Sequence, residues 1–237
     1  FEEVLAPATI STDHPNFLSF IPAAPTEAAT LFDLVVSASS IYGGSWTEGA
    51  GAVFAENQVL EFLAREAGLP KGAGGVFVQG GTLGNLSALV VARDVAEAKH
   101  GRHNWAIICS SEAHSSVKSV GKVMGVTVIS ADASQTGSLT GDAAESAIQE
   151  AKNQGLIPFA LVGTSGTTNF GIIDKLDELA NVAAANDLWF HVDGAYGLAG
   201  VLVEELKPLY LGLERADSFI VDPHKWLFAP FDACALV

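Results

Sequence analysis

Basic residues are scarce in this chain. Its 237 residues include 12 Lys and Arg against 27 Asp and Glu, which gives a formal net charge of −15, and the first basic residue is Arg65. The sequence contains no cluster of Lys or Arg that would neutralise a phosphate backbone. We therefore expect no nucleic acid among the partners of this protein.

Long apolar runs and metal-binding spacings are also missing. No apolar stretch approaches the roughly 20 residues that cross a bilayer, and the first residues lack the basic-then-apolar order of a signal peptide. Cys109 and Cys234 stand alone in the sequence, and neither Cys nor an acidic residue completes a metal set with His100 and His103. These absences predict no membrane partner, no metal site and a reducing, cytoplasmic location.

Hydrophobic residues make up 49% of the chain and occur in short continuous runs separated by segments with helical spacing. Such runs are typical of strands buried on both faces of a parallel sheet. The predicted strands are 75–79, 105–109, 126–130, 159–163, 189–193 and 218–221, and the predicted helices between them are 83–99, 115–124, 142–153 and 176–186. This alternation predicts an α/β fold with a doubly wound, mostly parallel sheet and right-handed crossovers.

The first 70 residues precede this alternation. Residues 25–40 and 53–67 have helical spacing, and the Gly-rich stretch between them, 41–51, is predicted to be a loop. We therefore divide the chain into an N-terminal helical segment, residues 1–70, and a larger domain, residues 71–237.

Two short runs with polar residues lie at the ends of predicted strands, namely Asp222-Pro223-His224-Lys225-Trp226 and His191-Val192-Asp193-Gly194-Ala195-Tyr196. Ligands of open α/β sheets bind at the carboxyl ends of the strands. An amine that forms a Schiff base and a carboxylate that keeps a pyridine nitrogen protonated are the side chains that pyridoxal phosphate needs most. Lys225 and Asp193 therefore indicate a pyridoxal phosphate site, with a turn-forming role of Asp193 as the structural alternative.

Two further features lie at predicted strand ends. The run from Gly80 to Gly84 follows one strand and opens a helix, so its backbone N–H groups and the Thr82 hydroxyl are placed to hold a phosphate. An ordinary tight turn between a strand and a helix has the same pattern. His114 follows another strand, and a single histidine in such a place is usually a helix cap or a buried structural residue.

Several motifs in a fixed order are more specific than any one of them alone. They are His14-Pro15-Asn16-Phe17, the run from Gln79 to Asn85, Glu112-Ala113-His114-Ser115-Ser116, Gly166-Thr167-Thr168, and the runs around Asp193 and Lys225. With these motifs the chain resembles the group II pyridoxal-phosphate-dependent amino acid decarboxylases, which include the aromatic-L-amino-acid, histidine and glutamate decarboxylases. The resemblance covers nearly all 237 residues and implies a fold-type-I, transferase-like large domain that binds pyridoxal phosphate.

The resemblance also implies roles for individual residues. Lys225 holds the cofactor, Asp193 contacts its pyridine nitrogen and His114 stacks on its ring, so these three are the expected catalytic residues. The expected cofactor contacts are Gly81, Thr82, Leu83, His114, Thr167, Asp193, Ala195, Asp222, His224 and Lys225, although the family often has Asn where Asp222 stands. The expected substrate contacts, all from the N-terminal segment, are Phe20, Ile21, Pro22 and Trp46.

The resembling family continues past the position that matches Val237 with a mobile loop and a smaller C-terminal domain. The chain also begins at Phe1 and has a single methionine, Met124. We therefore expect it to be roughly the first half of an enzyme that works as a homodimer together with its C-terminal half.

The predicted reaction is decarboxylation of an L-amino acid to its amine and CO2. We expect an aromatic substrate because residues 14–49 contain no Lys or Arg to pair with a substrate side-chain carboxylate. Another carbon–carbon lyase or an aldehyde-forming activity on the same scaffold, and a non-catalytic cofactor-binding half that needs a partner chain, are the alternatives. The sequence lacks both the Gly-x-Ser-x-Gly elbow of serine hydrolases and the Gly-x-Gly-x-x-Gly fingerprint of nicotinamide enzymes.

Overall fold

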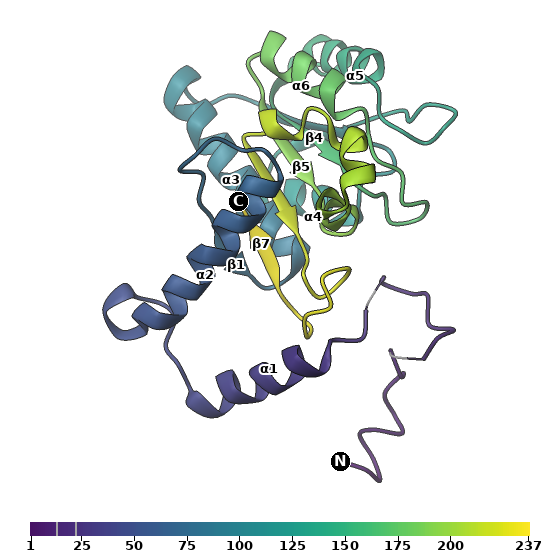
Figure 1. Ribbon diagram of the computed structural model, residues 1–237. Helices are drawn as coiled ribbons and strands as arrows, with labels where there is room; N and C mark the ends of the chain where they lie inside the picture. Colours follow the sequence, from purple (N-terminus) through teal and green to yellow (C-terminus); the bar gives the residue numbers. More distant parts are fainter. Residues whose placement is uncertain (13, 22) are drawn as a thin grey trace.

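A seven-stranded sheet with the order β1-β7-β6-β5-β4-β2-β3 forms the centre of the molecule (Figure 1). The computed structural model describes residues 1–12, 14–21 and 23–237. The strands are β1 (Val76–Val78), β2 (Trp105–Ser110), β3 (Thr127–Ala131), β4 (Ile157–Thr164), β5 (Trp189–Asp193), β6 (Ser218–Val221) and β7 (Cys234–Leu236). Only β7 runs against its neighbours among these strands, since it is antiparallel to both β1 and β6. The α/β prediction with a mostly parallel sheet is therefore confirmed.

Helices cover both faces of this sheet. They are α3 (Gly80–His100), α4 (Ser115–Met124), α5 (Gly141–Asn153) and α6 (Leu176–Ala185). On one face, Ile107 of β2 packs in a cluster with Leu89 of α3, and on the other face Ile108 packs in a cluster with Ile148 of α5. Consecutive residues of a strand point to opposite faces, so a strand with helices on both sides must be apolar throughout. Every residue of β2 is indeed buried.

The N-terminal segment packs unevenly against this core. Helix α1 (Glu27–Ser39) has no buried residue, and Figure 1 shows it standing away from the sheet. Helix α2 (Trp46–Glu66) lies closer, because Leu60, Leu63 and Ala64 in its second half join the large apolar cluster of the sheet. Within the described residues, no helix has the length and apolar character needed to traverse a lipid bilayer.

The structure corrects the predicted loop over residues 41–51. Helix α2 already begins at Trp46, and Gly49 inside it departs from helical geometry with φ −117° and ψ 28°. A Cβ on Gly49 would lie 2.1 Å from the Tyr42 carbonyl oxygen, so the close approach of the chain requires glycine there. The glycines therefore mark a kink within a helix and not only a loop before it.

Two further stretches were not predicted. The strand β7 has three residues, and the segment between β5 and β6 contains three short 3₁₀ helices, η1 (Gly197–Leu202), η2 (Glu204–Tyr210) and η3 (Leu213–Arg215). Elements this short show too few turns or alternations to be recognised from hydrophobic periodicity.

Candidate active site

A cavity of about 660 Å³ opens where the strands end. Its lining includes the residues that directly follow β1 and β6, His114 in the turn after β2, and the last residues of β4 and β5. These five strands run in the same direction, so their carboxyl ends meet at one edge of the sheet. The cavity therefore lies where an open α/β sheet binds its ligands.

The amino end of α3 forms one wall of the cavity through Gly80, Gly81 and Thr82. The N–H groups of a first helical turn have no partner within the helix, and they attract an anion such as phosphate. A Cβ on Gly81 would lie 3.2 Å from both the Ala195 Cβ and an Asp222 carboxylate oxygen, so glycine keeps this wall open. Leu83 contributes only backbone to this turn, because its side chain is partly exposed and does not line the cavity.

Gly84 brings α3 close to the sheet. A Cβ at this position would lie 2.7 Å from the Cys234 Sγ of β7, so a larger residue would push the helix away from the strand. Burial, together with the nearby Asp222 carboxylate, raises the pKa of the Cys234 thiol. Cys234 is therefore a protonated packing residue and not a reactive thiolate.

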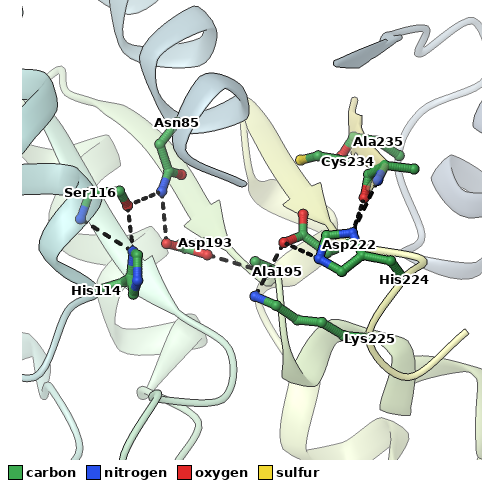
Figure 2. A network of polar contacts seen from close by, with 11 residues as sticks. Asn85, His114, Ser116, Asp193, Ala195, Asp222, His224, Lys225, Cys234 and Ala235 are labelled. Carbon is green, nitrogen blue, oxygen red and sulfur yellow. Dashed lines mark hydrogen bonds and ion pairs between the residues drawn. The ribbon is translucent and has the colours of Figure 1, made fainter. Parts of the chain in front are cut away.

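Lys225 reaches the cavity from the turn after β6. Its Nζ lies 3.1 Å from the Asp222 Oδ2, and the Asp222 side chain is 3% exposed (Figure 2). The Nε2 of His224 lies 3.8 Å from the same oxygen, while its Nδ1 is tied to the backbone of Ala233. Asp222 Oδ1 is buried without a hydrogen-bond partner in the described part of the chain. The buried Asp222 carboxylate thus holds the Lys225 amine at the cavity.

Asp193 is the last residue of β5 and lines the cavity. Its Oδ2 accepts a hydrogen bond from the Asn85 Nδ2 at 2.9 Å, and its Oδ1 accepts one from the Ala195 N–H at 3.2 Å. The bond to Ala195 is the turn-forming contact that the sequence offered as an alternative. Asp193 therefore forms this turn and also lines the cavity. Ala195 itself lines the cavity beside it.

His114 is both a helix cap and part of the cavity wall. It precedes α4, and its Nδ1 accepts the Ser116 N–H at 3.2 Å and lies 2.9 Å from the Ser116 Oγ. A ring nitrogen that accepts an N–H bears no proton, so the neutral ring carries its proton on Nε2.

Besides Leu83, three predicted residues do not line the cavity or cannot be placed. Thr167 is fully buried, its Oγ1 accepts the Ile172 N–H at 3.2 Å, and its neighbours Gly166 and Thr168 line the cavity in its place. Trp46 begins α2 and does not line the cavity. Pro22 lies outside the described residues, whereas Phe20 and Ile21 do line the cavity.

The cavity also contains residues to which the sequence assigned no role. Asn85 and Ser116 belong to motifs that point to the site, but nothing local shows where their side chains bond. Tyr196, Phe231 and Asp232 line the cavity as well, and the last two lie in a loop without a recognisable pattern. Of these five residues, Asn85, Ser116 and Tyr196 lie within the predicted motifs, and Phe231 and Asp232 do not.

The residues around the cavity fit pyridoxal phosphate. They supply a primary amine for its carbonyl group, a carboxylate for its pyridine nitrogen and a helix amino end for its phosphate. The part of the chain that the structure describes contains no group of three or more His, Cys, Asp or Glu residues arranged to hold a metal ion.

Comparison with known proteins gives one consistent family. The model of the pyridoxal-dependent decarboxylase conserved domain matches residues 1–237. An aromatic-L-amino-acid decarboxylase of Bacillus atrophaeus is 35% identical over 229 residues, which are 95% of this chain and 48% of that protein. The chain therefore spans about half the length of such relatives.

Two solved structures are similar over 99% of the chain. One is the glutamate decarboxylase domain of a diaminobutyrate-pyruvate transaminase and L-2,4-diaminobutyrate decarboxylase from Vibrio parahaemolyticus, with a TM-score of 0.92, 34% identity and 54% of that chain covered. The other is the Rhodiola rosea 4-hydroxyphenylacetaldehyde synthase, with a TM-score of 0.93, 31% identity and 53% of that chain covered.

Proposed function

The chain belongs to the pyridoxal-dependent decarboxylase family, and from this premise we propose that it is the cofactor-binding part of an enzyme that converts an L-amino acid, preferably an aromatic one, to its amine and CO2. The observation that supports this most is the meeting of Lys225, Asp193 and His114 in one cavity. Bound pyridoxal phosphate supplies an electron sink for the bond to the substrate Cα that breaks.

In this proposal each residue has a separate task. Lys225 would hold the cofactor, because its amine is the group at the cavity that can bond to the cofactor carbonyl. Asp193 keeps a proton on the pyridine nitrogen, since its negative charge lies at the end of β5 in a mostly buried position. His114 covers one face of the site, and the amino end of α3 binds the phosphate.

The cavity lining supports an aromatic substrate. Its walls include Phe17, Phe20, Ile21, Tyr196 and Phe231, and Lys225 is the only Lys or Arg among the described residues that line it. A substrate carboxylate buried without a cation would cost several kcal/mol, whereas an aromatic ring gains by burial against the same wall.

The substrate preference is tested by competition on the full-length protein. Tryptophan, tyrosine, phenylalanine, glutamate, aspartate and 2,4-diaminobutyrate are offered together, and the consumption of each is followed. The diamino acid is included because Asp222 and Asp232 also line the cavity and would attract a second ammonium group. We expect an aromatic substrate to be consumed first, and preferential loss of any of the other three would contradict the preference.

An aldehyde-forming reaction is the second candidate, because the similarity to the Rhodiola rosea synthase extends over nearly the whole chain. The two reactions start from the same amino acid and differ in product. Quantifying amine and aldehyde from one aromatic substrate decides between them, and we expect the amine. A protein that forms neither product but binds the cofactor would support the third reading, a non-catalytic cofactor-binding half.

We also propose that the working protein is a cytoplasmic homodimer in which α1 covers a second copy. The apolar side chains of this helix are more than half exposed, namely Leu31, Phe32, Leu34, Val35 and Val36. An apolar patch on one helix usually marks an interface. Leu31→Glu should shift the full-length protein toward monomer in sedimentation experiments, whereas Asp33→Asn on the same helix should not.

A further inference from the structure

We propose that Asn85 is a positioning residue that aligns Asp193 and His114 together, and that His191 sets the orientation of the Asn85 amide. The effect on catalysis rests on the proposed function. The hydrogen bonds behind the inference involve only side chains of this chain, so they can be tested separately.

Asn85 lies inside α3 and is 1% exposed. Its Nδ2 donates to the Asp193 Oδ2 and to the Ser116 Oγ, each at 2.9 Å, as Figure 2 shows. Its Oδ1 lies 2.9 Å from the His191 Nε2. A buried amide is unfavourable unless it is hydrogen-bonded, and asparagine is a poor helix former. Both amide hydrogens and the amide oxygen of Asn85 form hydrogen bonds. This arrangement is the one expected if the amide positions its neighbours.

The hydrogen bonds through Asn85 have a fixed direction. Trp189 Nε1 can only donate, and it donates to the Ser218 Oγ at 2.8 Å, which lies 2.8 Å from the His191 Nδ1. At the other end the ionised Asp193 can only accept, so the Asn85 nitrogen faces it and the Asn85 oxygen faces His191. His191 must therefore carry its proton on Nε2 and accept the Ser218 hydroxyl proton at Nδ1.

The protonation state of His191 agrees with the direction of these hydrogen bonds. It is fully buried, and this burial lowers its pKa to about 4 despite the nearby Asp193. A neutral ring has one proton, and the acceptor oxygen of Asn85 keeps that proton on Nε2. If the amide were turned over, its oxygen would meet the Asp193 carboxylate and its nitrogen would meet a ring N–H. The Asp193 carboxylate and the His191 Nε2–H thus act together against the wrong orientation of Asn85.

A second set of hydrogen bonds leads from the same amide to His114. The second Nδ2 hydrogen of Asn85 is accepted by the Ser116 Oγ, so the Ser116 hydroxyl proton is directed at the His114 Nδ1. That leaves the His114 Nε2–H without a hydrogen-bond partner among the described residues. One amide therefore holds the carboxylate for the pyridine nitrogen and, through Ser116, supports the proton position that the Ser116 backbone N–H also gives to His114.

The test compares variants of the full-length protein by two readouts. The first is ¹⁵N NMR of the imidazole nitrogens without cofactor, with signals assigned through His114→Gln and His191→Gln. The second is the dissociation constant of added pyridoxal phosphate and the pH dependence of its visible absorption. Asn85→Asp replaces the donor nitrogen by an acceptor of the same shape. Ser116→Ala removes the hydroxyl that links Asn85 to His114 but leaves the bonds of Asn85 to Asp193 and His191. His191→Leu removes the donor to Asn85.

The inference predicts a specific pattern. Wild-type His114 and His191 should both be neutral with the proton on Nε2. Asn85→Asp should convert His191 to its charged form at pH 7 and weaken cofactor binding at least tenfold. Ser116→Ala should move the His114 signals and leave those of His191. His191→Leu should weaken cofactor binding, whereas His191→Gln, which keeps an N–H for the Asn85 oxygen, should stay within about threefold of wild type.

Asn181→Asp is the control, because Asn181 accepts a hydrogen bond from Arg215 on the exposed side of α6. Wild-type imidazole signals and cofactor affinity in Asn85→Asp would overturn the inference. If Asn85→Asp does not fold, equal cofactor affinity in His191→Leu and His191→Gln would overturn it. Expected NMR signals in a wild-type protein that forms neither product would instead contradict the proposed function and leave the positioning role supported.

Discussion

Replacing Asp193 with asparagine separates the two things that this carboxylate does. Each of its oxygens accepts one N–H, from Asn85 at 2.9 Å and from Ala195 at 3.2 Å. An amide has a single oxygen, so one of these buried donors would face an NH₂ group. An unmatched buried donor costs about 1–3 kcal/mol. We therefore expect Asp193→Asn to fold, with its free energy of unfolding lowered by about that amount.

The effect of this variant on the reaction should be larger. An amide cannot hold the pyridine nitrogen protonated, and a charged group aimed at a reacting centre is worth about 3–4 kcal/mol, or about 10²–10³ in rate. The assay is single-turnover CO2 release at saturating substrate and cofactor, with cofactor occupancy checked by absorption and stability by urea denaturation. A loaded, folded Asp193→Asn enzyme that turns over within about threefold of wild type would refute the electron-sink role.

Asp217→Asn provides the matched control for this experiment. Asp217 also accepts a buried backbone N–H, from Phe190 at 2.7 Å, but it does not line the cavity. Burial raises the pKa of its carboxyl. Asp217→Asn can keep its acceptor oxygen, so we expect unchanged turnover and at most a small change in stability. Equal loss of rate in both variants would indicate a general effect on folding.

Three further predictions concern other residues of the site. Borohydride reduction of the loaded enzyme followed by peptide mapping should place the cofactor on Lys225, and Lys225→Ala should lower turnover by more than about 10³-fold; label on another lysine contradicts the assignment. Asp222→Asn removes a negative charge beside Gly81, so the dissociation constant of pyridoxal phosphate should fall about tenfold, and a weaker complex would show that Asp222 aids binding. Burial lowers the pKa of His191 to about 4 from an ordinary value of 6.5. The stabilisation of the folded protein by neutral His191 is therefore present above pH 6.5 and is lost as the pH falls through 4. Wild type should therefore lose about 2 kcal/mol more than His191→Gln between pH 7 and pH 5 in urea denaturation, and equal slopes would rule this out.

The convergence of the main site residues could be predicted because each follows a strand. Lys225, Asp193 and Thr82 lie next to continuous apolar runs, and the carboxyl ends of parallel strands meet whatever their order in the sheet. The same rule holds for His114 after β2. Local sequence is sufficient to predict the position of these residues, because the direction of a strand determines at which edge of the sheet the next residue lies.

The remaining contacts depend on residues far apart in the chain. Asn85 bonds to Ser116, 31 positions away, and to Asp193, 108 positions away, and no local pattern records such pairs. The position of Thr167 depends on a turn. It follows Gly166, whose φ is 92°, and the turn aims the Thr167 hydroxyl at Ile172 and away from the cavity. The strand order, and β7 within it, likewise follows from tertiary pairing.

The antiparallel strand β7 also sets the order in which the molecule can form. In the sheet, β1 pairs with β7 alone, through Val76 with Leu236 at one end and Val78 with Cys234 at the other. During synthesis β1 leaves the ribosome long before its partner, so we expect it to stay unpaired until β7 is made. Gly84 of α3, which follows β1, lies against both Ile220 of β6 and Cys234 of β7, so part of this contact forms only when β7 inserts between β1 and β6. We therefore expect the cavity wall at the amino end of α3 to reach its final packing in the step that closes the sheet.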